Sequence, residues 1–412
     1  MKRISDYRHI VGDAVVGEIY QKAKPLYGKR VLHINSTFIG GGVAEILTSL
    51  VPLMNDAGLD ADWRILHGST DLFGLTKKFH NALQGEAINL TKRKTRRYES
   101  ANENFSAYAI IDHDLVIIHD PQPLPLIDFY KKKQPWIWRC HIDLSRPDRD
   151  LWEYLKGFIL RYDLAILSHE KYRKKDLPVR QHIVHPVIDP LSTKNMDMSA
   201  KEIQDLMQEF SIPSDKPLIT QISRFDKWKD PLGVVEVFRM VRKKLDCRLI
   251  LCGSMAMDDP EGVEIYDEVK ARTLDLVRRG DVILITFENN RLVNLLQRIS
   301  SVVIQKSVRE GFGLTVTEAM WKQRPVVASN VGGITLQIAD GEDGFLVEAE
   351  DIQGFADRIV EIIKHPDLAR EMGKRARENV RNRFLITRLL LDYLDIIRYE
   401  VSENKPAKAL HD

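Results

Sequence analysis

The sequence predicts an α/β protein with two doubly wound domains. Residues 30–55 and residues 301–321 each have the pattern of a buried strand, a glycine-rich turn and a helix. A stretch with two prolines begins near residue 186, and the alternation of strands and helices restarts after it. Such alternation is typical of parallel sheets covered by helices on both faces. We therefore predict a first domain at residues 1–190, a linker near 186–200 and a second domain at 200–384, with a cleft between the two sheets.

Length and composition agree with this reading. At 412 residues the chain is too long for a single core. Its 44% hydrophobic and 29% charged residues are typical of a soluble globular protein. No run approaches the ~20 apolar residues of a membrane span, and the N-terminus has no apolar signal core. The three cysteines show neither zinc-site spacing nor a disulfide pattern. We expect a cytoplasmic protein without a membrane partner.

The charge distribution does not favour a nucleic-acid partner. The net charge is +2, so any positively charged site has to be local. The densest basic run, residues 92–97, is short and has no interleaved aromatic residues. We interpret it as a solvated face of a helix or loop.

The other elements follow from short apolar runs and helical periodicity. Residues 1–28 have the pattern of an amphipathic helical lead-in. We expect first-domain strands at 30–35, 61–66, 115–119, 136–140 and 164–167. Second-domain strands are expected at 218–223, 249–252, 282–286, 301–305, 325–328 and 344–347. Helices are expected at 231–244, 291–299, 314–321 and, as one long helix, from about 367 to 397.

A glycine-rich loop follows the first predicted strand. Gly40, Gly41 and Gly42 precede a helix that continues to about Asn55. The spacing is neither a dinucleotide-binding fingerprint nor a Walker loop. Three glycines before a helix let a phosphate or a sugar approach the backbone closely. A tight turn without a ligand stays open as the alternative.

Polar side chains follow two further strands of the first domain. His119, Asp120 and Gln122 come after the strand at 115–119, and His141 and Asp143 come after the strand at 136–140. Ligands of open α/β sheets bind outside the carboxyl ends of the strands, where these residues would lie. Structural alternatives remain: Asp120 starts a turn before a proline, and Asp143 caps the following helix.

The second domain places cations at the end of its first strand. Arg224 and Lys229 precede a helix that begins at Pro231. A planar guanidinium and a mobile ammonium at this position suit a diphosphate. Ion pairs with Asp226 and Asp230 at the surface are the alternative.

Two carboxylates flank the second glycine-rich turn. Glu310 precedes Gly311, Phe312 and Gly313, and Glu318 lies on the helix that follows. Exposed backbone N–H groups, a helix N-terminus and two acids suit a ligand that carries both phosphate and hydroxyl groups. An ordinary strand-to-helix turn with surface acids is the alternative.

Together these residues carry a resemblance to a known family. Arg224 with Lys229, Glu310 with Glu318, the glycines 40–42 and His141 resemble the retaining glycosyltransferases of family 4, which have the GT-B fold of two Rossmann-like domains. The likeness covers roughly residues 29–395. Residues 35–47, 78–85, 119–123, 138–145 and 309–321 are similar to the trehalose glycosyltransferring synthases within that family.

The resemblance implies a function and a role for each site residue. It implies transfer of glucose from a nucleoside diphosphate glucose (UDP or ADP) to free glucose, giving trehalose with retention, without a metal or other cofactor. The catalytic set would be His141, Arg224, Lys229 and Glu310. The donor would be bound by Gly40, Gly41, Gly42, Arg224, Lys229, Gly311, Phe312, Gly313, Leu314, Thr315 and Glu318. Asp120 and Gln122 are the candidates for acceptor contacts. A C-terminal helix at about 385–412 would complete the first, acceptor-side domain.

Other functions stay open on the same residues. A family 4 transferase with a different small sugar or a natural product as acceptor, and a retaining trehalose phosphorylase, share the architecture. A non-catalytic scaffold that binds a sugar nucleotide is the alternative outside enzymes. The assembly state also stays open, with a homodimer as one option.

Overall fold

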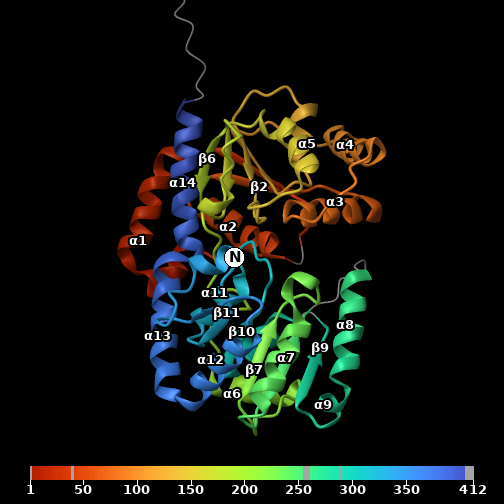
Figure 1. The fold of residues 1–412 in the computed structure, drawn as a ribbon. Coiled ribbons are helices and arrows are strands. Elements are labelled where there is room, and N and C mark those ends of the chain that lie inside the picture. Colours follow the sequence, from red (N-terminus) through yellow and green to blue (C-terminus); the bar gives the residue numbers. More distant parts are fainter. Residues whose placement is uncertain (1, 39–40, 254–259, 288, 404–412) are drawn as a thin grey trace, which may run out of the picture. The chain divides into compact units, whose positions relative to one another are not determined.

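The computed structural model describes residues 2–38, 41–253, 260–287 and 289–403. The chain divides into two compact units, Met1–Val187 with Ile386–Asp412 (unit 1) and Ile188–Leu385 (unit 2). Each unit holds one six-stranded parallel sheet with helices packed on it (Figure 1). The predicted α/β architecture with two doubly wound domains is therefore confirmed.

Unit 1 contains a sheet in the order β2-β1-β3-β4-β5-β6. Its strands are β1 (Arg30–Asn35), β2 (Asp60–Ile65), β3 (Leu115–His119), β4 (Trp136–Arg139), β5 (Leu164–Leu167) and β6 (Arg180–Ile183). All neighbours pair in parallel. After β1 the chain adds β2 on one side of the sheet and then β3 on the other side of β1. The carboxyl ends of β1 and β3 therefore form the switch point, where ligands of such sheets bind.

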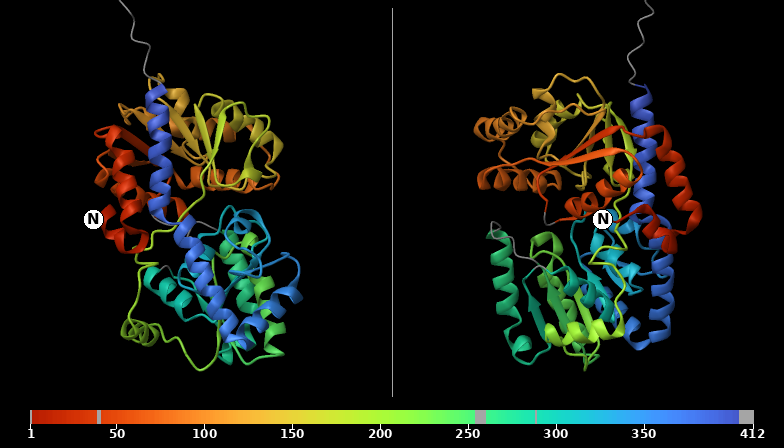
Figure 2. Two further views of the ribbon diagram at one scale, coloured as in Figure 1. Left: turned by 90° about the vertical axis from the view of Figure 1, so that its left-hand side faces the viewer. Right: turned by 180° about the vertical axis from the view of Figure 1, so that it is seen from behind.

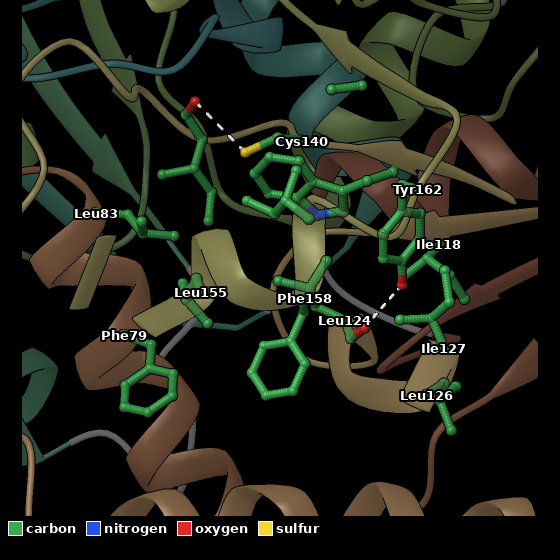
Figure 3. Close-up of a cluster of buried hydrophobic side chains, with 14 of the residues drawn as sticks. Phe79, Leu83, Ile118, Leu124, Leu126, Ile127, Cys140, Leu155, Phe158 and Tyr162 are labelled. Carbon is green, nitrogen blue, oxygen red and sulfur yellow. Dashed lines mark hydrogen bonds between the residues drawn. The ribbon is translucent and has the colours of Figure 1, made fainter. Parts of the chain in front are cut away.

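The two faces of this sheet pack against different helices. Leu32 and Ile34 join a core with α3 (Thr70–Leu83), α4 (Lys92–Ser106) and α5 (Arg149–Ile159). Figure 3 shows part of this core, in which the Tyr162 hydroxyl donates to the carbonyl of Leu124 at 2.7 Å. Alternate residues of a strand point to opposite faces, so His33 lies on the other side of β1.

That other side is covered by α2 (Gly42–Asp56) and α14 (Ile386–Glu403). α14 also packs against α1 (Arg8–Ala23), as two views of the ribbon show (Figure 2). The prediction of one long C-terminal helix was wrong, because α13 (Pro366–Arg383) ends before Phe384 and α14 begins at Ile386. Phe384 and Leu385 are fully buried, so the break lets both side chains enter the core. The predicted helix end at 404–412 lies outside the described residues.

Unit 2 contains a sheet in the order β12-β11-β10-β7-β8-β9. Its strands are β7 (Leu218–Ile222), β8 (Arg248–Cys252), β9 (Val282–Ile285), β10 (Val302–Gln305), β11 (Val326–Ser329) and β12 (Phe345–Val347). Numbered from its own first strand, this is the order 3-2-1-4-5-6 of dinucleotide-binding domains. The switch point lies between the carboxyl ends of β7 and β10.

Helices cover both faces of this sheet as well. α7 (Pro231–Arg242) and α12 (Ile352–Lys364) pack on one core, and α6 (Ala200–Glu209) and α10 (Asn290–Ile299) pack on the other. The described residues of this unit also form the α-helices α8 (Pro260–Arg272), α9 (Leu274–Arg278), α11 (Leu314–Trp321) and α13. Among the described residues, no helix is both long enough and apolar enough to cross a membrane.

Most predicted strands agree with the structure to within a residue, but β6 was missed. Its sequence, Arg-Gln-His-Ile, has no apolar run, and its side chains are exposed or half-buried. β6 is an edge strand that is specified by its pairing with β5. The predicted start of a helix at Pro231 and the predicted helix 314–321 are confirmed.

Candidate functional site

The switch point of unit 2 brings the predicted cation and acid together. Lys229 follows β7 and Glu310 follows β10, and the Lys229 Nζ donates to Glu310 Oε2. The side chains are only 16% and 11% exposed. Glu310 Oε2 also accepts from the Ser307 hydroxyl at 3.2 Å. The structure therefore pairs Lys229 with Glu310, and Asp230 pairs instead with the buried Lys306.

Arg224 lies on the same loop in a more open position. Its Nη2 is 3.1 Å from Asp226 Oδ2, and its side chain is 52% exposed. Asp226 Oδ1 accepts from the backbone N–H groups of Trp228 and Lys229, which holds the loop in a short turn. The predicted alternative of an ion pair with Asp226 is thus present. Because Asp226 is anchored by the backbone, Arg224 can leave it without unfolding the loop.

Hydrogen bonds and close packing from residues 333–337 hold the backbone of the glycine-rich turn at 311–313. Gly313 has φ +86° and is the N-cap of α11, so its lack of a side chain matters here. The Gln337 Nε2 donates to the carbonyls of Phe312 and Gly313, and the Gly333 N–H donates to the Glu310 carbonyl at 3.1 Å. A Cβ on Gly333 would lie 2.5 Å from the Gly311 carbonyl oxygen, so this close packing requires glycine.

The predicted donor residues of this turn differ in what they can offer. The Phe312 side chain is buried against Phe384, with ring centroids 5.6 Å apart. It can therefore contribute only its backbone to a ligand. Leu314 and Thr315 begin α11, and the Thr315 hydroxyl donates to Gln305 Oε1 at 3.1 Å. Because the N-cap residue Gly313 has no side chain, it does not cap the first backbone N–H groups of α11.

Glu318 lies on α11 and is almost fully buried. Its Oε2 accepts from the Gln297 amide at 3.0 Å, and its Oε1 lies 3.8 Å from Lys194 Nζ. Lys322, one turn later, donates to Asn195 and Gln297 side-chain oxygens at 2.7 Å each. Burial lowers the pKa of Lys322 to about 7. A polar network therefore fixes the carboxylate of Glu318.

The switch point of unit 1 lies at the ends of β1 and β3. Gly41 has φ +83° and caps α2, in which Gly42 is the first residue. Gly40, predicted with them as part of the loop, lies outside the described residues. Asn35, at the end of β1, accepts from the Trp63 indole at 2.8 Å and donates to the Thr37 carbonyl at 2.8 Å. The loop thus leaves β1 in a defined direction.

Asp120 has a structural contact in addition to its predicted role. It has φ +61°, and its Oδ1 accepts from the His141 backbone N–H at 2.7 Å. Burial raises the pKa of Asp120 to about 6. Gln122 contributes its carbonyl to Asn102 at 3.2 Å. Asp143 does not cap the next helix as the structural alternative proposed, because it accepts from the Ser145 N–H, and Asp148 caps α5.

His141 is the end of a line of three imidazoles. His33 Nδ1 lies 3.0 Å from His119 Nε2, and His119 Nδ1 lies 3.1 Å from His141 Nε2. Burial lowers the pKa of His33 to about 3 and lowers the pKa values of His119 and His141 well below their ordinary value. All three rings are therefore neutral at pH 7.

We expect unit 1 to lose stability on acidification. An unfolded histidine binds a proton near pH 6.5, whereas these three do not when folded, so the stability present above that pH is lost as the pH falls. Asp120 changes the stability in the opposite direction. Its raised pKa contributes stability that is lost as the pH rises through about 6. The three histidines together outweigh Asp120. From pH 7 to 5.5 each histidine should cost about 1.2 kcal/mol and Asp120 should offset about 0.8 kcal/mol, so the free energy of unfolding of unit 1 should fall by about 3 kcal/mol.

Urea unfolding followed by hydrogen exchange would measure this, with peptides from β1 and β3 compared with peptides from β7 and β10. Unit 2 is an internal control, because His365 is the one histidine between residues 188 and 385. Equal losses in both units would contradict the assignment to the histidine line.

Sequence reasoning missed several residues that support the site. Lys306 follows β10 directly and neutralises Asp230, whereas Gln337 and Lys322 come from outside the motifs. His33 sits in the middle of an apolar strand, and a polar residue at a buried strand position was the available signal. Among the described residues, no group of three or more His, Cys, Asp or Glu side chains could hold a metal ion.

Comparison with known proteins decides the family. Residues 33–174 match the family model of the trehalose synthase N-terminal domain, and residues 202–379 match that of glycosyl transferases group 1. A trehalose synthase of Thermococcus litoralis is 47% identical over 401 residues, which cover 96% of this chain and 97% of that protein. The chain belongs to the trehalose synthase family of glycosyltransferases.

Two further comparisons place this trehalose synthase family member more widely. A solved α,α-trehalose 6-phosphate synthase of Burkholderia multivorans superposes with a TM-score of 0.72 over 92% of this chain and 100% of that one, at 15% identity, and so shares the GT-B fold. A trehalose phosphorylase of Pleurotus pulmonarius is 28% identical over 92% of this chain and 58% of its own length. The chain is thus a trehalose-related glycosyltransferase with the GT-B fold.

Proposed function

We propose that this chain transfers glucose from a nucleoside diphosphate glucose to free glucose and so makes trehalose, with retention of configuration. The observation that carries the proposal is the mostly buried pair of Lys229 and Glu310 at the unit 2 switch point, beside the N-terminus of α11. A cation and a helix N-terminus suit a diphosphate. A carboxylate next to them suits the hydroxyl groups of a sugar.

Different residues bind the diphosphate, the glucose and the ribose of the donor. Arg224 and Lys229 stabilise the charge that grows on the β-phosphate as the nucleoside diphosphate leaves. The backbone of residues 311–315 adds the N–H groups of the turn and of the helix start. Glu310 binds the glucose, and Glu318, which Gln297 orients, binds the ribose.

Unit 1 supplies the sugar-side contacts. The loop that contains Gly41 and Gly42 approaches the donor sugar, and His141 donates to one of its hydroxyl oxygens. Asp120 and Gln122 contact the acceptor. Membership of the trehalose synthase family supports glucose as that acceptor.

The chemistry needs no nucleophile from the protein. The bond between the glucose C1 and the β-phosphate oxygen breaks while the acceptor hydroxyl attacks C1 from the same face. The proton of that hydroxyl moves to the leaving phosphate, so the products are trehalose and a nucleoside diphosphate. We propose a metal-independent reaction, with UDP or ADP as the carrier, in the cytoplasm; a homodimer is the assembly to test.

Incubation of the purified chain with UDP-, ADP- and GDP-glucose and a panel of free monosaccharides tests this function. We expect one nucleotide and glucose to give the α,α-1,1 disaccharide, identified by the anomeric couplings in the NMR spectrum. Release of one nucleoside diphosphate per disaccharide is expected. Transfer to another acceptor in preference to glucose would contradict the specificity, and binding of the donor without any transfer would contradict the enzyme.

The similarity to trehalose phosphorylase favours one second candidate. Trehalose with inorganic phosphate and no nucleotide would then give glucose 1-phosphate, whereas the proposed reaction would give none. Maltose alone serves as a further control. Trehalose formed from maltose without a nucleotide would show an isomerisation and overturn the proposal.

A further inference from the structure

The line of three histidines runs from the core of unit 1 to the carboxyl ends of strands β3 and β4. His33 comes from β1, His119 ends β3, and His141 follows β4. Adjacent rings are stacked, with centroids 5.3 Å and 5.4 Å apart. His33 and His119 are buried, whereas His141 is half-buried. The line therefore connects a buried end at His33 with a half-buried end at His141, which a ligand can reach.

The two short nitrogen contacts couple the protons of all three rings. A neutral imidazole carries one N–H donor and one acceptor nitrogen. Each contact needs one proton, so a donor on one ring requires an acceptor on the next. Only two arrangements satisfy both contacts. In the outward arrangement every ring donates toward His141, and in the inward arrangement every ring donates toward His33.

The buried end of the line, at His33, distinguishes the two arrangements of the protons. His33 Nε2 is buried and has no hydrogen-bond partner. In the inward arrangement this atom carries an N–H without an acceptor, and buried N–H groups without partners are rare. In the outward arrangement the same atom carries only a lone pair. The outward arrangement leaves the free N–H at Nδ1 of His141.

We propose that His33 and His119 are positioning residues that fix the tautomer of His141, so that it presents an Nδ1–H donor to a ligand oxygen. The identity of that oxygen, a hydroxyl of the donor sugar, rests on the proposed function. The tautomer itself does not. With its Nδ1 already protonated, His141 acts as a hydrogen-bond donor and not as a base.

The tautomer can be read directly in the free protein. Selective ¹⁵N-histidine labelling distinguishes a protonated from a bare ring nitrogen, and His141→Gln assigns the signal. We expect protonated Nδ1 and bare Nε2 at His141 at pH 7.5. A protonated Nε2 with a bare Nδ1, or a mixture of both tautomers, would overturn the proposal. This result does not depend on any substrate.

Variants of His33 separate positioning from stability. His33→Leu removes the donor at the start of the line, whereas His33→Asn keeps an amide N–H near the position of Nδ1. We expect His33→Leu to mix the tautomers of His141 and to lower kcat/KM by about 10-fold, the effect of one hydrogen bond. His33→Asn should keep the wild-type signal and most of the rate.

His113→Leu is the matched control. His113 is also buried in unit 1, and its ring nitrogens lie 3.0 Å from Asp62 Oδ2 and 3.7 Å from Asp112 Oδ1, away from the histidine line. This variant should lose stability while the His141 signal and the rate persist. Equal losses of rate in His33→Leu and His33→Asn, with an unchanged His141 signal, would reduce His33 to a packing role and refute the proposal. If no donor supports transfer, the proposed function fails while the ¹⁵N spectra still decide the tautomer.

Discussion

Arg224→Ala should lower the rate of glucosyl transfer by at least about 100-fold, because it removes one donor to the developing phosphate charge. The fold should survive. Arg224 is half exposed, and Asp226, its ion-pair partner among the described residues, keeps both backbone N–H bonds when the guanidinium is gone. Steady-state kinetics with the preferred donor, together with thermal unfolding, would measure both outcomes.

Arg272→Ala is the matched control for this variant. Arg272 is 54% exposed and pairs with Glu268 at 2.7 Å, so it loses a comparable surface ion pair in the same unit. It should retain the full rate. A wild-type rate in Arg224→Ala, or an equal loss in Arg272→Ala, would remove Arg224 from the site.

Lys229→Met should abolish transfer and also destabilise unit 2. It leaves the mostly buried carboxylate of Glu310 without the ammonium beside it, which should cost about 2 kcal/mol after allowance for partial exposure. The rate should fall by at least about 1000-fold, since the phosphate cation and the orientation of Glu310 are lost together. Urea unfolding and single-turnover kinetics provide the two measurements.

The double variant Lys229→Met with Glu310→Gln separates the two effects. Removal of both charges should restore most of the stability, because the two side chains interact directly. It should not restore the rate. Recovery of transfer in the double variant would show that Lys229 serves only to neutralise Glu310. Lys244→Met, which removes an exposed lysine paired with Asp357, controls for the loss of a surface ion pair.

Local patterns were enough to predict the elements that carry the site. The strand 30–35, the helix 314–321 and the helix start at Pro231 have strong apolar runs, glycine turns or proline placement, and all were confirmed. Arg224, Lys229 and Glu310 could be named because they lie in the loops that follow predicted strands, and Glu318 because it lies on the predicted helix after the second glycine-rich turn. β6 could not be predicted, because a polar edge strand is specified by its neighbour rather than by its own residues.

The sequence by itself therefore determined the fold class, the family and the residues at the strand ends. Only the tertiary structure decided how those residues are paired: Lys229 with Glu310, Asp230 with Lys306, and Glu318 with Gln297. It also placed His33 in one line with the histidines at the ends of two other strands. These contacts join residues up to 86 positions apart, and local spacing carries no information about which side chains a sheet order brings together.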